Sequence, residues 1–427
     1  METFKNEQVN STKIHQKQSN VPQIRFKSFN DAWEQCKLDE ITNRVLRKNK
    51  NLESELPLTI SAQEGLVDQE KFFNKRIASK DLRNYLLVEN GEFAYNKSYS
   101  SGYPWGVIKR LYKYPRGVVS SLYIVFSPIL DKIDSSFLVV FFESELWHSQ
   151  ISKRAAEGAR NHGLLNIQAS DFFDIDLTLS SLSEQRQIGQ FFKDLDNLIT
   201  LHQRKCDQLK NIKKSLLEKL FPKNGTLYPE LRFKGFTDAW EQRKALNIAE
   251  YSKGNGYSKG DLKESGTPII LYGRLYTNYQ FSIGEVDTFV SPKNDSIYSQ
   301  GNEVIVPASG ESAEDIARAS AVEKSGVLLG GDLNVIRPFN FIFPLFLAIA
   351  ISNGEIQKEL AKKAQGKSVV HIHNSDIQKL EISYPELEEQ KQIGAIFLKI
   401  DKLITLHQRK VEKLKKVKAS LLEKMFV

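Results

Sequence analysis

The sequence predicts an α+β protein with a pseudo-twofold internal duplication, in which two globular α/β domains are separated by two long antiparallel coiled-coil helices. Three observations lead to this fold class. A long helical segment occurs twice, a short opening motif occurs twice, and two unlike segments of nearly equal length lie between them. Internal repeats of this kind are decisive because they show how the chain is organised before any single motif is interpreted.

The helical segment carries the longer of the two repeats. Residues 184–221 and 389–426 are identical at 24 of 38 positions, at an offset of 205. The opening motif RFKSFNDAWEQ at Arg25–Gln35 returns as RFKGFTDAWEQ at Arg232–Gln242, with 9 of 11 positions identical, and a fainter echo links residues 166–172 with 371–377. A solenoid would have short repeats with similar interiors. Here the motifs at the two ends of each half repeat while the segments between them differ. This predicts that the two segments have the same kind of function but act on two different targets.

These repeated motifs predict five segments: a disordered polar tail at 1–20, a first domain at 21–180, a helix at 181–222, a second domain at 228–383 and a helix at 384–427. The tail has no apolar stretch, so it does not resemble a signal peptide. Both domains contain short apolar runs between turn residues, which predict strands. Four examples are Leu122–Phe126, Phe137–Phe142, Pro268–Tyr272 and Glu303–Pro307.

Apolar residues recur every seven positions in both helical segments, which predicts a coiled-coil seam about five heptads long. The seam positions are Ile188, Leu195, His202, Leu209, Leu216, Ile393, Ile400, His407, Leu414 and Leu421. A second row lies four residues further on, and Lys213 interrupts it. Ser181 or Ser183 is expected to cap the first helix, which Pro222 and Gly225 close. Each helix is then roughly 55 Å long.

The direction of the helices follows from the short link between the first helix and the second domain. About six residues reach at most ~20 Å, so the second domain begins at the far end of the first helix. If the seams pack together, the second helix runs back antiparallel to the first. His202 and His407 on the seam are then either a polar layer that sets the register or metal ligands, and the first reading is favoured.

Charge and cysteine content limit the class of protein. The chain has 60 Lys and Arg against 52 Asp and Glu, a net charge of +8, which favours polyanionic partners. The stretches 203–224 and 408–427 together carry +10; they are either solvated helix faces or surfaces that lie along phosphates. Two cysteines cannot form a disulfide framework and fit a reducing, cytoplasmic setting. The apolar run 339–352 contains Pro344 and is too short to span a bilayer.

No catalytic, cofactor-binding or metal-binding motif is found in either domain. There is no phosphate-binding loop and no HExxH pair, and His371 and His373 have no partners at metal-ligand spacing. Basic and aromatic residues alternate in several loops, where they are candidates for contacting phosphates and base edges. The candidates are Lys97, Tyr99, Lys109, Arg110, Tyr112, Lys113, Arg116, Lys253, Asn255, Tyr257, Lys259, Arg274, Tyr276, Lys367 and Ser368.

The duplicated pattern resembles the specificity subunits (HsdS) of type I restriction–modification systems. The resemblance covers nearly the whole chain, and it is carried by Arg25–Glu34, by Arg232–Glu241 and by the EQxQIG…LITLHQRK…LLEK helices that close each half. Two further stretches look similar to the family, residues 93–120 and 303–337. The longer polar N-terminal tail departs from the family pattern, and no role is assigned to it.

The resemblance implies that each domain is a target-recognition domain that reads one half of a split, asymmetric double-stranded DNA sequence. It implies that the helices set the spacing between the half-sites and dock two modification (methyltransferase) subunits, joined by two restriction subunits, with no membrane involved. S-adenosylmethionine, ATP and Mg would act on those partners, and the chain would hold no cofactor of its own. A ~55 Å spacer would place two readers somewhat more than one ~34 Å turn of DNA apart.

Three other functions remain open from the sequence. A stand-alone two-headed DNA-binding regulator would bind tightly without partners, whereas a specificity subunit would depend on a modification subunit. A coiled-coil scaffold would show no strong, salt-dependent affinity for DNA. An enzyme is disfavoured because no catalytic motif is found.

Overall fold

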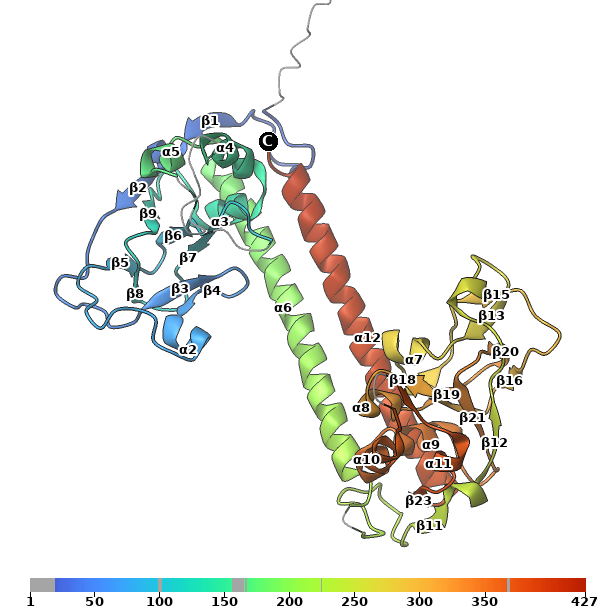
Figure 1. Ribbon diagram of the computed structural model, residues 1–427. Coiled ribbons are helices and arrows are strands. Elements are labelled where there is room, and N and C mark those ends of the chain that lie inside the picture. Colours follow the sequence, from blue (N-terminus) through green and yellow to red (C-terminus); the bar gives the residue numbers. More distant parts are fainter. Residues whose placement is uncertain (1–19, 99–101, 156–164, 166, 224, 367–368) are drawn as a thin grey trace, which may run out of the picture. The chain divides into compact units, whose positions relative to one another are not determined.

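The computed structural model describes residues 20–98, 102–155, 165, 167–223, 225–366 and 369–427, so the predicted disordered tail lies outside the described residues apart from Asn20 (Figure 1). The chain divides into two compact units. Unit 1 contains the described residues up to Thr200 together with Val411–Val427, and unit 2 contains Leu201–Lys410. Each unit therefore holds one α/β domain, which we call domain 1 or domain 2, and part of each long helix.

The two long helices are α6, Leu182–Lys219, and α12, Leu387–Lys424, and both are unbroken. Ser181 caps α6, because its Oγ accepts a hydrogen bond from the Glu184 backbone N–H at 3.4 Å. In unit 2, His202 faces His407 and Lys213 faces Asp401.

In unit 1, Asp196 faces Lys418. The two contacts in unit 2 join the later of their α6 residues to the earlier of their α12 residues, which confirms the antiparallel pairing. Ile188, Leu195, Ile393 and Ile400 of the predicted seam are buried. The other six seam positions are half-buried: His202, Leu209, Leu216, His407, Leu414 and Leu421.

Domain 1 is built on a four-stranded antiparallel sheet. Its strands have the order β2 (Thr42–Val45), β9 (Ile124–Pro128), β6 (Phe93–Asn96) and β7 (Val107–Arg110). Around it lie β1 (Glu34–Lys37), which pairs with β10 (Asp176–Leu179), and the helices α1 (Leu38–Ile41), α3 (Ser135–Glu143), α4 (Leu146–Ala155) and α5 (Ala169–Phe173). A second layer adds β3 (Leu58–Ser61), β4 (Gly65–Asp68), α2 (Gln69–Phe73), β5 (Leu86–Glu89) and β8 (Arg116–Val119).

Domain 2 repeats this arrangement although its interior does not align with domain 1 by eye. Its main sheet has the order β12 (Ala249–Lys253), β21 (Leu333–Pro338), β17 (Val304–Pro307), β19 (Ser320–Val322) and β14 (Ser282–Ile283). The three pairings among its first four strands are antiparallel, as in domain 1. Equivalent outer elements are β11 (Glu241–Lys244), which pairs with β23 (Glu381–Tyr384), the 3₁₀ turn η1 (Ala245–Asn247), α9 (Pro344–Ile351), α10 (Gly354–Lys363) and α11 (Asn374–Ile377).

The domains differ in what is inserted into this shared sheet. The remaining elements of domain 2 are η2 (Lys259–Asp261), β13 (Thr267–Ile270), α7 (Arg274–Thr277), β15 (Phe289–Val290), β16 (Tyr298–Gln300), β18 (Ser309–Gly310), α8 (Ala313–Ile316), β20 (Ser325–Leu329) and β22 (Val370–His371). Most of them lie between β12 and β17. In domain 1 the same interval, from β2 to β6, holds β3, β4, α2 and β5. The unlike parts therefore enter at the same point of a common sheet.

The predicted strand at Phe137–Phe142 is wrong, because these residues form α3. The Asp134 carboxylate caps this helix by accepting hydrogen bonds from the N–H groups of Ser136 at 2.8 Å and Phe137 at 3.0 Å. The helix is buried on nearly all sides, so it lacks the polar face whose periodicity would distinguish it from a buried strand. The other three predicted strands are present as β9, β13 and β17, each within two residues of the expected bounds.

The apolar run at 339–352 contains α9, whose residues from Leu345 to Ile351 are buried in the core of unit 2. Among the described residues, no helix is both long and apolar enough to cross a membrane.

Candidate nucleic-acid interface

The repeated sequence motifs hold each domain onto the long helices. In unit 1, the Arg25 guanidinium donates two hydrogen bonds of 2.7 Å to the carboxylate of Glu184. In unit 2, Arg232 does the same with Glu389 at 2.9 Å. Both carboxylates are fully buried, and these hydrogen bonds raise the pKa of each arginine above its ordinary value. The opening motif and the helix are therefore joined by one buried ion pair in each unit.

The next residue of each helix orients a second helix of the domain. The Gln185 side-chain oxygen accepts a hydrogen bond at 2.8 Å from the backbone N–H of Asp134, the N-cap of α3. The Gln390 oxygen accepts the equivalent bond from Phe343, the N-cap of α9, at 2.8 Å.

Gly189 and Gly394, one turn further along the long helices, allow the same helix starts to pack closely. A side chain at Gly189 would lie 2.8 Å from the Ser136 Cβ, and one at Gly394 would lie 2.9 Å from the Phe343 ring. The EQxQIG sequence is thus a docking motif for the domain helix, and its repetition follows from that role.

The opening motifs also bind the ends of the long helices. The backbone N–H of Ile24 donates to the Lys424 carbonyl of α12 at 3.0 Å, and that of Leu231 donates to the Lys219 carbonyl of α6 at 2.9 Å. These bonds satisfy carbonyls that a helix end leaves unpaired. Nearby, Trp33 packs edge-on against Phe426, and Trp240 packs edge-on against Phe221 in unit 2.

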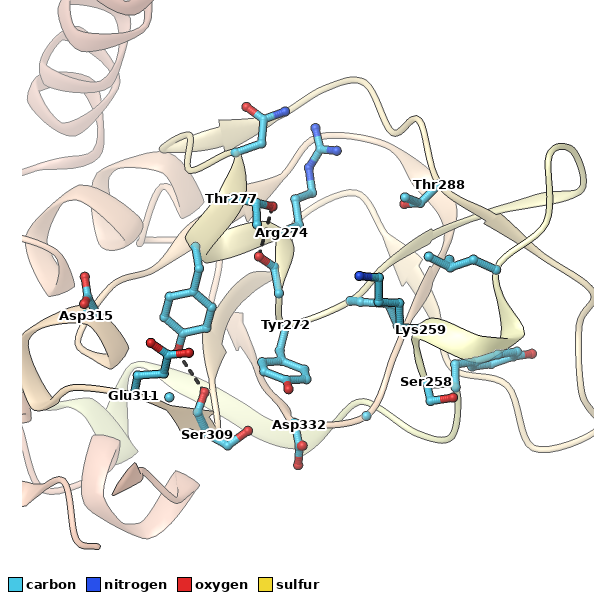
Figure 2. A pocket seen from close by; sticks show the side chains of 18 of the residues that line it. Ser258, Lys259, Tyr272, Arg274, Thr277, Thr288, Ser309, Glu311, Asp315 and Asp332 are labelled. Carbon is cyan, nitrogen blue, oxygen red and sulfur yellow. Dashed lines mark hydrogen bonds between the residues drawn. The ribbon is translucent and has the colours of Figure 1, made fainter. Parts of the chain in front are cut away.

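Domain 2 has a large cleft that gathers four of the predicted DNA-contacting residues. The cleft has a volume of about 1310 Å³, and its wall includes Tyr257, Lys259, Arg274 and Tyr276 (Figure 2). These residues come from η2, α7 and the loops beside them, all within the insertion between β12 and β17. The sequence candidates from this insertion are therefore brought to one surface, with the exception of Asn255.

The charges of this cleft are largely compensated. Arg274 donates to the Asp287 carboxylate at 2.7 Å and to the Glu285 carbonyl at 2.8 Å. Arg318 pairs with Asp315. Three basic side chains, Lys259, Arg274 and Arg318, stand against four acidic ones, Asp287, Glu311, Asp315 and Asp332.

Asn255, Tyr257 and Tyr276 are held by hydrogen bonds. The Asn255 amide donates to the Asp295 carboxylate at 2.6 Å. The Tyr257 hydroxyl accepts from the Lys293 N–H at 2.7 Å. The Tyr276 hydroxyl donates to the Ser309 carbonyl at 2.7 Å, and burial raises its pKa. Their polar groups are therefore fixed in place, while Lys253 and Lys259 are exposed.

The candidates in domain 1 do not form one site. The Lys97 ammonium donates to the Ile167 carbonyl at 2.9 Å, and burial, assisted by Arg44, lowers its pKa. The Arg110 guanidinium donates to the Ser135 hydroxyl at 2.6 Å, and burial lowers its pKa as well. Both cations are turned inward, which fits a structural role.

The remaining candidates of domain 1 are more accessible. Tyr112 is 59% exposed, with the Lys113 ammonium 6.0 Å from its ring centre. Arg116 is exposed and lies 3.3 Å from the Glu53 carboxylate, and Lys109 on β7 is half-buried. The main hollow of domain 1, about 440 Å³, is lined by other residues. Tyr99, Lys367 and Ser368 lie outside the described residues.

The sequence reasoning missed one basic and aromatic surface of domain 1. Phe72, Phe73 and Ile77, in and after α2, are 42–52% exposed within a segment rich in lysine and arginine. The run KFFNKR has the same alternation of basic and aromatic residues that identified the other candidates. It could have been found by applying that criterion to residues 71–76.

The seam histidines contact each other. Their Nδ1 atoms are 3.0 Å apart, so one ring donates a hydrogen bond to the other. Within the described residues, no group of three or more His, Cys, Asp or Glu side chains could hold a metal ion. This geometry fits the polar layer of the two readings given above.

Comparison with known proteins shows which proteins this chain is similar to. Residues 237–416, which contain domain 2 and most of α12, match the family model described as type I restriction modification DNA specificity domain. The MjaVIII type I restriction enzyme specificity subunit of Methanocaldococcus jannaschii is 24% identical over 328 residues, covering 72% of this chain and 73% of that protein. A putative MjaX specificity subunit from the same organism is 24% identical over 70% of this chain and 69% of that protein.

A crystal structure of the type I restriction–modification S subunit from M. genitalium has the same fold. It matches with a TM-score of 0.58 at 14% identity, over 95% of this chain and 99% of that one. The resemblance seen in the sequence is thus confirmed. The chain is therefore similar, over most of its length, to the specificity subunits of type I restriction–modification systems.

Proposed function

We propose that this chain is a non-catalytic subunit that reads a bipartite, asymmetric DNA sequence and directs partner subunits to methylate and cleave DNA. One observation carries the proposal: the two units share their anchors and main sheet, but different elements are inserted at the same point of that sheet. Two domains that read different half-sites need to be attached to the helices in the same way, but they need different DNA-facing surfaces. Domain 1 would read one half and domain 2 the other.

The cleft of domain 2 is the proposed reading surface of the second half-site. Exposed Lys253 and Lys259 are suited to phosphates. Glu311 and Asp332 line the cleft and can accept hydrogen bonds from the amino groups of cytosine or adenine. Because Arg274 and Arg318 are already paired with carboxylates, reading of guanine by a free arginine is disfavoured in this cleft.

The long helices are the proposed docking surface for two modification subunits. In unit 1 the apolar side chains Phe191, Leu198 and Val417 are 38–46% exposed. In unit 2, Leu403 is 36% exposed and Ile212 is 50% exposed. Leu403 is the repeat equivalent of Leu198, and Ile212 is the repeat equivalent of Val417, both at the offset of 205. Each unit thus offers a similar apolar surface, which supports one modification subunit per unit. Two restriction subunits would join the assembly, and S-adenosylmethionine, ATP and Mg would act on the partners.

The test is to map methylated adenines genome-wide in cells that contain the modification subunit, with and without this chain. A split sequence motif that is methylated only when the chain is present is the expected result. If no such motif appears, although the modification subunit is shown to be present, the proposal is wrong.

A second test concerns the helices as the spacer between the half-sites. α6 runs unbroken from unit 1 into unit 2, and four residues added to it amount to about 6 Å of helix. We expect such an insertion to lengthen the unread gap of the motif and to leave both half-sites unchanged. A changed half-site with an unchanged gap would contradict this role.

The alternative of a stand-alone DNA-binding regulator makes a different prediction. It requires the purified chain alone to bind its target as tightly as the assembled complex does. The exposed apolar residues on both long helices argue against it, because a self-sufficient protein would be expected to cover them.

A further inference from the structure

Domain 1 carries a different exposed surface at the insertion equivalent to the one that forms the cleft of domain 2. This surface is the segment Lys71–Arg83, which begins in α2. It contains five basic residues and one acidic residue: Lys71, Lys75, Arg76, Lys80, Arg83 and Asp81. In Figure 1, α2 lies at the opposite end of domain 1 from β1, α4 and α5. It is thus remote from the anchors that hold the domain to the helices.

The segment is rigidly held although its apolar side chains are exposed. The Asp68 carboxylate caps α2 by accepting hydrogen bonds from the N–H groups of Glu70 at 3.0 Å and Lys71 at 3.3 Å. Further along, Ala78 and Leu82 are buried in a small apolar cluster with Leu87 and Val118, on β5 and β8. Anchoring at both ends means that the outer face is a defined surface.

Three large apolar side chains occupy this outer face. Phe72, Phe73 and Ile77 are 46%, 42% and 52% exposed, and the two phenylalanine rings contact each other edge to face, with their centres 5.0 Å apart. The contact orients the two rings relative to each other. Exposed, ordered aromatic residues on a surface are characteristic of a binding site.

The charges around these rings identify the kind of ligand. Lys71 is paired with Asp68 at 3.5 Å, and Arg76 with Glu70 at 3.4 Å. Lys75 and Lys80 are exposed and make no ion pair within the described part of the chain. Free cations beside apolar rings are complementary to duplex DNA, which offers phosphates and, in the major groove, the thymine methyl group. An apolar protein partner would not require this excess of positive charge.

We propose that the Lys71–Arg83 segment is the DNA-reading element of domain 1. Lys75 and Lys80 contact phosphates, and Phe72 and Phe73 make apolar contacts with base edges in the half-site that domain 1 recognises. The proposal rests on the proposed function, and it makes domain 1 a reader of a different kind from domain 2. Domain 1 uses apolar contacts beside free cations, whereas domain 2 uses a cleft whose arginines are already paired.

The test compares the motif methylated by the assembled modification complex with that of its Phe72→Ala/Phe73→Ala variant. We expect the variant to lose discrimination roughly tenfold at one or two base pairs of one half-site, since a single mismatch has an effect of about this size or larger. The other half-site should be unchanged. Leu130→Ala is the matched control, because Leu130 is an apolar residue of domain 1 that is 67% exposed and lies outside the segment.

A second variant separates the cations from the rings. Lys75→Ala/Lys80→Ala should weaken binding of a short duplex carrying the wild-type motif without changing the motif. It should also reduce the slope of log affinity against log salt by about 2, close to one for each phosphate that is no longer neutralised.

The outcomes distinguish this inference from the function on which it rests. A wild-type complex that methylates no split motif overturns the proposed function. A wild-type complex with a split motif, together with a Phe72/Phe73 variant that has the same motif and affinity, overturns only the inference. A variant that fails to assemble with the modification subunit also overturns it, because the rings would then bind a protein.

Discussion

The two units differ most where they are least constrained by the long helices. Arg25 with Glu184, and Arg232 with Glu389, make the same buried ion pair in both units. The inserted segments differ: unit 2 has a cleft of about 1310 Å³, and unit 1 has exposed phenylalanines among lysines. The two halves of the duplicated chain therefore share the residues that attach each domain to the long helices. They differ in the residues that each inserted segment exposes. Changes to the anchors should therefore have equal effects in the two units, and changes elsewhere unequal ones.

The largest expected effect comes from removing the anchor carboxylates. Glu184→Ala should destabilise unit 1, and Glu389→Ala unit 2, by about 3–5 kcal/mol each, because a buried arginine is left without its partner. Hydrogen exchange followed separately in each unit would measure this. Glu355→Ala is a suitable control, because Glu355 and its ion-pair partner Lys358 are both exposed, and such a surface pair adds little stability. Effects that differ between the units by more than ~1 kcal/mol would contradict the equivalence of the anchors.

The long helices and the opening motifs could be predicted from the sequence because each of them occurs twice in it. A repeat of 24 identical positions revealed the helices, their limits and, with a short link, their direction. What the repeated residues do could not be predicted, since the partners of Glu184 and Gln185 lie 159 and 51 residues away in the sequence. Helix α3 was mistaken for a strand because it is buried on nearly all sides, and such a run has no informative period.

The candidate site was predicted less well for a physical reason. A loop sequence shows which residues are basic or aromatic, but it does not show whether a basic side chain faces solvent or is already bonded to another group of the protein. Lys97 and Arg110 donate to groups inside domain 1, and Arg274 is neutralised by Asp287. Conversely, the apolar and basic run at Lys71–Arg76 was overlooked, although its exposure is among the clearest features of domain 1.

A smaller and unequal effect is expected from Lys418 and Lys213, which occupy equivalent positions on the helices. Lys418 contacts two carboxylates, Glu143 at 2.8 Å and Asp196 at 2.6 Å. Lys213 contacts only Asp401 among the described carboxylates, at 2.6 Å, and lies 4.2 Å from the centre of the Phe281 ring.

We expect Lys418→Met to cost about 2–3 kcal/mol of stability, because two carboxylates lose their cation. Lys213→Met should cost about 1 kcal/mol, since a methionine can still pack on the Phe281 ring. Denaturant unfolding of both variants would test this difference. Equal costs would show that the second carboxylate adds nothing.

The cost of Lys418→Met should also depend on pH. Burial already raises the pKa of Asp196, and Lys418 partly offsets that rise. Without the lysine, the folded-state pKa lies still further above the unfolded value, so the folded variant gains stability as pH falls through it. The difference between wild type and variant should therefore shrink on acidification. Adding Asp196→Asn to the variant should reduce that dependence.

A further comparison uses the exposed apolar residues of the long helices. Leu198→Glu in unit 1 and Leu403→Glu in unit 2 should each remove one of the two proposed modification subunits, and the double variant should remove both. A charge placed in such an interface is expected to cost about 2 kcal/mol, or roughly thirtyfold in affinity. The mass of the assembled complex, measured by light scattering, reports the number bound. Loss of both subunits in either single variant would contradict one docking surface per unit.

The smallest effect is expected at the histidine pair of unit 2, and it depends on pH alone. Burial lowers the pKa of His407, and His202, Lys205 and Lys410 lower it further. When the pKa of a histidine is lower in the folded chain than in the unfolded chain, the unfolded chain binds the proton more readily. The protein therefore loses stability as the pH falls below the ordinary histidine pKa. The denaturation midpoint of unit 2 should thus fall between about pH 7 and 5. His407→Leu should remove this contribution, and His202→Leu, which deletes one positive neighbour, should reduce it. If the midpoint varies with pH to the same extent in all three proteins, the pair does not titrate as its surroundings require.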